Sequence, residues 1–205
     1  MKTNSTIAGR RRRAERGFSM IEAVVVIALI LIITAMAMIQ MPAALQNARS
    51  DTALRQVVEQ IRQAREYSIA NRRYVQVAFL AGPPSQIQIT QRNDLTAGAG
   101  AVRVLSTVPL QFPMAFTVFA AMNDTPDQYG KAAAILFAGV NGGPPAGMLF
   151  QSDGQLVSAA TLLPINGTVF LGVAGNQSTA RAVTVMGTTG RVRGWKGNGL
   201  NWNQF

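Results

Sequence analysis

Two groups of charged residues have types and spacing that allow a specific chemistry. Glu22 is a carboxylate inside an apolar run, and it follows the arginines at positions 10–13 and 16. Arg191 and Arg193 lie near the other end, two residues apart, with Trp195 and Lys196 directly after them. An ionisable group at membrane depth requires a partner of opposite charge. Paired guanidiniums suit the oxygens of phosphate groups.

Other kinds of chemistry find little support in the sequence. The chain contains no cysteine and no histidine, which removes imidazole and thiolate catalysis and nearly all zinc, copper and haem sites. Asp124 and Asp127 are close enough to hold a cation, but we predict a solvated loop there. Gly197-Asn198-Gly199 begins like a dinucleotide fingerprint without room for its helix, so we predict a flexible tail. We therefore expect no enzyme, no catalytic residue, no metal and no cofactor.

The charge of the chain predicts a polyanionic partner. The formal net charge is +10, and no acidic residue occurs from Gly154 to Phe205. The same stretch holds Arg181, Arg191, Arg193 and Lys196. A basic segment of this kind is an argument about partners rather than about fold.

The N-terminal segment is long enough to cross a membrane. Between Phe18 and Met41 the polar residues are Ser19, Glu22, Thr34 and Gln40. As a helix the segment spans roughly 36 Å, more than a hydrocarbon core of about 30 Å. The preceding arginines should remain cytoplasmic, which places the rest of the chain outside. A secretory signal would be shorter, and a plain anchor would leave Glu22 at the lipid interface near the helix N-terminus.

The string Gly17-Phe18-Ser19-Met20-Ile21-Glu22 resembles the type III signal of type IV pilins and pseudopilins. The resemblance implies that a prepilin peptidase cuts between Gly17 and Phe18 and that Phe18 is then methylated. It also implies that the apolar helix is retained and that Glu22 pairs with the new α-ammonium group of a neighbouring subunit. The implied partners are the peptidase/methyltransferase, the inner membrane and other subunits. The implied location is a single pass through the inner membrane with a periplasmic domain, extracellular once assembled.

The rest of the chain predicts a helix followed by short strands. Pro42 should kink or break the first helix, and helical spacing resumes to Arg73 with Leu54, Val58 and Ile61 on one face. We expect a leader at 1–17, a transmembrane and assembly helix at 18–41, an amphipathic helix at 42–73 and a β-rich domain at 74–205. The expected strands are Tyr74–Leu80, Gln86–Arg92, Val102–Thr107, Ala115–Phe119, Ala133–Phe137, Met148–Gln151, Leu156–Ser158, Thr168–Val173 and Ala182–Met186. Asn166-Gly167 predicts a hairpin turn. The expected class is α+β, a long helix packed on an antiparallel sheet.

This order of elements resembles pilins, and two features resemble the GspH/FimT branch of minor pilins and pseudopilins. They are the turn Phe150–Gly154 and the ending Val183–Arg193. In FimT-type pilins a Gly-Arg-x-Arg string is linked to DNA uptake, which implies non-specific binding of double-stranded DNA here. The candidate DNA-binding residues are Arg181, Arg191, Arg193, Trp195 and Lys196. Two alternatives remain: a GspH-like pseudopilin of a type II secretion system without DNA binding, or arginines that only protect an edge strand from aggregation.

Overall fold

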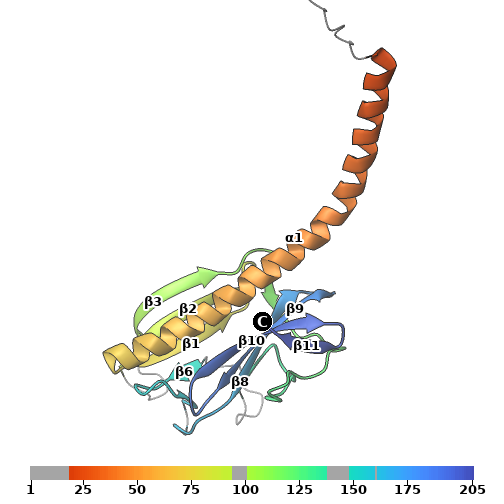
Figure 1. Ribbon diagram of the computed structural model, residues 1–205. Helices are drawn as coiled ribbons and strands as arrows, with labels where there is room; N and C mark the ends of the chain where they lie inside the picture. The colour runs from red at the N-terminus through yellow and green to blue at the C-terminus, as the bar shows by residue number, and fades with distance from the viewer. Residues whose placement is uncertain (1–18, 94–100, 138–147, 160) are drawn as a thin grey trace, which may run out of the picture. The chain divides into compact units, whose positions relative to one another are not determined.

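A computed structural model describes residues 19–93, 101–137, 148–159 and 161–205, and it divides the chain into two compact units. The first unit is Met1–Pro42 and the second is Ala43–Phe205. A single long helix, α1 (Met20–Asn71), contributes to both units (Figure 1). The strands all belong to the second unit.

Helix α1 continues through Pro42, so of the expected kink or break, the break does not occur. A proline inside a helix removes one hydrogen bond, and the bonds of the flanking turns maintain the helix on either side. In the second unit α1 buries one face at helical spacing, which confirms the predicted amphipathic segment. The buried residues of this face are Ser50, Ala53, Leu54, Val57, Ile61, Ala64 and Ser68.

The strands form two antiparallel sheets. The five-stranded sheet has the order β3-β2-β1-β6-β7, and the six-stranded sheet has the order β11-β10-β9-β8-β4, with β5 also paired to β8. The first sheet contains β1 (Tyr74–Leu80), β2 (Gln86–Arg92), β3 (Ala101–Pro109), β6 (Met148–Phe150) and β7 (Leu156–Val157). The second contains β4 (Ala115–Phe116), β5 (Ile135–Phe137), β8 (Gly167–Val173), β9 (Asn176–Met186), β10 (Arg191–Asn198) and β11 (Asn201–Gln204). In Figure 1, α1 runs across these strands.

The main core lies between α1 and both sheets. Leu54 and Ile61 of α1 are fully buried in one cluster with Val77 of β1 and with Val183 and Val185 of β9. A smaller cluster contains Phe170, Trp195 and Trp202 and includes no residue of α1. The helix therefore covers one face of the second sheet. This arrangement confirms the expected α+β class, a helix packed on antiparallel sheets.

Two local predictions are wrong. No hairpin joins the strands at Asn166-Gly167, because Gly167 begins β8 and the side chain of Asn166 accepts a hydrogen bond from the Gly187 N–H. The predicted flexible tail is instead the β10–β11 hairpin. Trp202 holds this hairpin against the domain, because its ring is buried and its Nε1 donates to the carbonyl of Asn123 at 2.8 Å. The indole thus finds both an apolar contact and a hydrogen-bond acceptor.

A junction of two glycine turns and one arginine joins α1 to both sheets. Gly154 lies in the β6–β7 turn and Gly190 in the β9–β10 turn, and both have positive φ angles, of 82° and 64°. A Cβ atom on Gly190 would clash with the Gly154 carbonyl oxygen and with Nε of Arg65. Arg65 Nε donates to that same carbonyl at 3.2 Å. Only glycine allows this approach, so the two turns hold each other and the helix in register.

Gly190→Ala should therefore destabilise the protein more than Gly175→Ala. Gly175 also has a positive φ, of 79°, but open space surrounds its missing Cβ. Both variants share a backbone penalty of about 1–2 kcal/mol, and the clash at Gly190 should add about 2 kcal/mol. Urea unfolding of the full chain in mild detergent, followed by circular dichroism, measures the difference. Equal losses for the two variants would contradict the junction.

Candidate functional site

The N-terminal part of α1 is an apolar helix with one carboxylate. The stretch Met20–Met38 has a mean hydropathy of 2.8, and by length and composition it can cross a membrane. Its apolar side chains are exposed, and Glu22 lies in the first helical turn. The hydroxyl of Thr34 donates to the carbonyl of Ile30 at 2.7 Å, so this polar group is satisfied within the helix. Glu22 is the charged group that still requires an external partner. Gly17 and Phe18 lie outside the described residues.

The five candidate DNA-binding residues, four cations and one tryptophan, do not lie on one surface. Arg191 and Arg193 are on the same face of β10 because side chains alternate along a strand. Trp195 shares this face, but it is buried and its Nε1 donates to Thr184 Oγ1 at 2.8 Å. Lys196 lies on the opposite face, toward α1, where it pairs with Asp51. The predicted patch is therefore divided by the sheet itself.

Arg181 and Lys196 both pair with Asp51 of α1. Arg181 is 0% exposed, and its Nε lies 2.7 Å from Asp51 Oδ1. Its Nη1 donates to the carbonyls of Ser178 and Ala180. Lys196 Nζ lies 3.1 Å from Asp51 Oδ2, with its side chain 46% exposed. Arg181 therefore neutralises a charge inside the fold and presents no surface to a ligand.

On the face of the second sheet that points away from α1, Asp127 pairs with a basic residue as Asp51 does on the helix side. It pairs with Arg193 Nη1 through one oxygen and accepts from Thr184 Oγ1 through the other. Asp124 accepts from the N–H groups of Thr125 and Gly130, so the expected loop is present, but both of its carboxylates are half-buried and paired rather than solvated. Burial, with the nearby Asp127, raises the pKa of Tyr129. Among the described residues, no three His, Cys, Asp or Glu side chains form a potential metal site.

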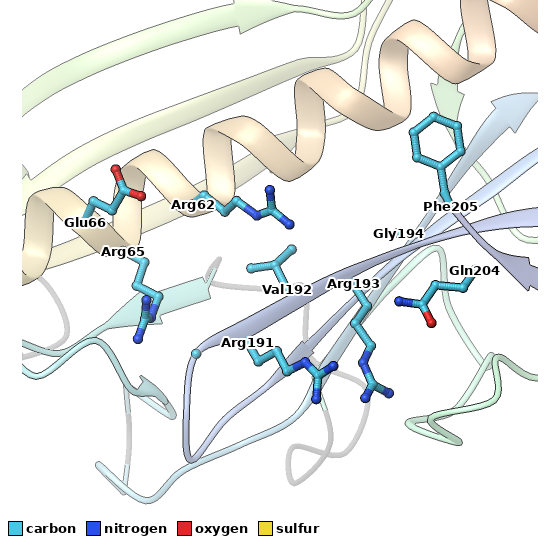
Figure 2. A pocket seen from close by; sticks show the side chains of 10 residues that line it. Arg62, Arg65, Glu66, Arg191, Val192, Arg193, Gly194, Gln204 and Phe205 are labelled. Atoms are coloured by element: carbon cyan, nitrogen blue, oxygen red, sulfur yellow. The ribbon is translucent and has the colours of Figure 1, made fainter.

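A groove of about 490 Å³ lies between α1 and β10 (Figure 2). Arg62 and Arg65 enter it from the helix, and Arg191 is at its other side. Figure 2 shows Val192 pointing toward the helix while Arg191 and Arg193 extend away from it. Neither Arg62 nor Arg65 was among the candidate site residues of the sequence analysis. Their spacing of one helical turn could have placed these two arginines on the same side of the helix. The sequence does not specify that β10 lies opposite them.

The comparisons with known proteins concern the N-terminal segment. Residues 12–38 match the family model of the prokaryotic N-terminal methylation motif. The matched residues include Gly17, Phe18 and Glu22, and the motif supports a type IV pilin-type or pseudopilin protein, a class of structural subunits processed by prepilin peptidase. No curated protein and no solved structure gives a significant match to the chain.

Asp51→Ala should destabilise the second unit and reduce its sensitivity to acid. Removing one partner of a buried ion pair costs about 3–5 kcal/mol, and Arg181 would remain buried and unpaired. Burial alone raises the pKa of Asp51, but hydrogen bonds and charge from Arg181 and Lys196 lower it below 3.8. The stabilisation by Asp51 is therefore present above pH 3.8 and is lost as the pH falls through the folded-state pKa.

Urea unfolding between pH 3 and pH 7 measures both effects, with Glu59→Ala as the matched control. Glu59 is an exposed carboxylate on the same helix, without an ion pair among the described residues. Its removal should change stability by less than about 1 kcal/mol. If Asp51→Ala kept the acid sensitivity of the unmodified chain, the pairing with Arg181 would not be a stabilising interaction.

Proposed function

We propose that this protein is a type IV pilin-like filament subunit, cleaved between Gly17 and Phe18, methylated on Phe18 and assembled through α1. The observation that supports this most directly is the exposed apolar stretch Met20–Met38, which begins with Glu22 and lies within the matched methylation motif. Such a surface is stable in a lipid bilayer or against other apolar helices, but not in water. The same segment therefore serves as a membrane anchor before assembly and as a packing surface afterwards.

Glu22 has a specific role in this proposal. Cleavage creates an α-ammonium group at Phe18, whose unperturbed pKa is about 7.7–8.0. In a dry bundle of helices a carboxylate and an ammonium attract each other far more strongly than in water. Pairing Glu22 of one subunit with the terminus of its neighbour also sets the register between them, which is an attested role of buried polar groups.

Glu22→Ala should prevent incorporation into filaments without preventing cleavage. The reason is that the peptidase acts at Gly17, whereas the proposed pairing occurs only between assembled subunits. Expression in a pilus- or pseudopilus-forming host, with mass spectrometry of the mature N-terminus and immunoblotting of sheared filaments, measures both. Thr34→Ala is the matched control, since Thr34 is satisfied within its own helix. A mature protein that begins at Met1, or normal incorporation of Glu22→Ala, would refute the proposal.

The more specific part of the proposal concerns which assembly contains the subunit, a type IV pilus or a type II secretion system. A FimT-like minor pilin would bind extracellular DNA, and a GspH-like pseudopilin would not. The basic C-terminal segment supports the first of these. Of its candidate residues, Arg191 is exposed and has no carboxylate within 4 Å among the described residues, whereas Arg193 and Lys196 each pair with an aspartate. If DNA is bound, Arg191 is therefore the residue that contributes most.

Under the FimT-like proposal, duplex DNA should bind to the full chain in detergent and be released by salt. Arg191→Gln should reduce the slope of log K against log salt by about one phosphate contact. Arg103→Gln is the control, because Arg103 is an exposed arginine in a strand of the other sheet. Fluorescence anisotropy at several salt concentrations measures the slope. An unchanged slope would remove Arg191 from the DNA contact, and absent binding would favour the GspH-like alternative.

A further inference from the structure

One edge of β10 is open along part of its length. On one side β9 pairs with β10 from Arg191 to Lys196. On the other side β11 pairs with it only from Trp195 to Asn198, and the N–H of Phe205 donates to the Gly194 carbonyl at 3.0 Å. Main-chain groups two residues apart point to the same edge of a strand. The N–H and C=O of Val192 therefore point to the same edge as those of Gly194, where no strand of the described chain pairs with them.

This open edge forms one wall of the groove beneath α1. Phe205 lines the groove and also a smaller hollow of about 260 Å³ formed with Arg55 and Val58. The guanidinium carbon of Arg55 lies 5.3 Å from the centre of the Phe205 ring. An extended segment that pairs with β10 thus already places one side chain between the helix and the strand. The same geometry is available to a second extended segment alongside Val192.

The charges around the groove select for an acidic occupant. Arg62 and Arg191 are exposed, and neither has a carboxylate within 4 Å in the described residues. Arg65 donates to a main-chain carbonyl rather than to an acid. Glu66 is the only acidic residue that lines the groove among those described. Cations from the helix and from the strand thus stand on two sides of an unpaired strand edge.

We propose that the β10 edge at Arg191–Gly194 binds an extended, acidic segment of a partner protein by strand addition beneath α1. The main chain of the segment pairs with Val192, and its acidic side chains reach Arg62 on one side and Arg191 on the other. Main-chain hydrogen bonds provide affinity in such complexes, and the side-chain contacts provide specificity. The inference is independent of filament assembly, because the site is contained within the second unit.

A peptide fits this edge better than a nucleic acid does. The open edge offers both a donor, the N–H of Val192, and an acceptor, its carbonyl. A phosphodiester supplies acceptor oxygens alone, so it would leave the carbonyl unpaired. A peptide strand supplies both groups at the spacing that the edge requires. Shape and hydrogen bonding therefore favour an extended chain at Val192, whereas charge alone would accept either ligand.

The test uses a capped, fluorescein-labelled peptide that repeats Val-Val-Glu-Glu, so that the extended strand carries glutamates on both faces, titrated into the full chain in detergent. A second peptide of the same sequence carries N-methyl groups on alternate main-chain amides, which block strand pairing without changing charge. A third replaces glutamate by lysine. We expect the first peptide to bind and the other two to bind at least tenfold more weakly. Arg62→Glu and Arg191→Glu should each weaken the first peptide about tenfold, while Arg103→Glu should have no such effect.

Three results would overturn the proposal. Equal binding of the N-methylated peptide would show that affinity comes from charge without strand addition. Equal effects of Arg191→Glu and Arg103→Glu would show that the contact lies outside the groove. Binding of duplex DNA without binding of the acidic peptide would identify nucleic acid as the ligand. Native circular dichroism spectra of the variants ensure that lost binding does not reflect lost folding, since the altered arginines are exposed.

Discussion

The buried pairing of Arg181 with Asp51 is the interaction on which the second unit depends. A guanidinium without exposed surface cannot be solvated, so its charge must be met inside the protein. Asp51 of α1 and the carbonyls of Ser178 and Ala180 meet it. The acid belongs to the helix and the arginine to β9, so the pair fixes the helix at one position on the sheet. Apolar packing holds the two together but tolerates sliding far better than an ion pair does.

The position of α1 determines what the surface offers. The two glycine turns and Arg65 fix the helix near β10, and the aspartate pairing fixes it again near Lys196. Between these two points the helix stands above a strand edge that β11 covers only in part. The groove therefore lies between two rigid attachments of the helix to the sheets. Of the arginines that line it, Arg62 and Arg191 are exposed, whereas Arg193 pairs with Asp127 and Arg65 donates to the Gly154 carbonyl.

The two ends of the chain follow different physical rules. The stretch Met20–Met38 exposes its apolar side chains and is suited to lipid or to other helices. Continuing the same helix, residues 43–71 bury one apolar face against the sheets and expose the other to water. A single element thus meets two solvents, and the change occurs near Pro42, where the two compact units divide. One charge in the first part, Glu22, and the cations of the second define the two sites of interest.

Much of the fold was predictable because local patterns specify it. The expected strands Tyr74–Leu80 and Gln86–Arg92 coincide with β1 and β2, and helical spacing predicted the buried face of α1. The methylation motif was predictable for the same reason, since its residues are consecutive. The β10–β11 hairpin was missed because its stability comes from Trp202 docking on the Asn123 carbonyl, a contact between distant residues.

The sequence by itself determined the apolar helix, the motif around Glu22 and the placement of Arg191 and Val192 on opposite faces of a strand. Only the tertiary structure decided which arginines remain available. Arg181, Arg193 and Lys196 look equivalent to Arg191 in the sequence, yet each pairs with an aspartate far away along the chain, Arg181 and Lys196 with the same one. Charge is a property of a residue, but its accessibility depends on the long-range pairing of strands and helix, which local periodicity does not encode.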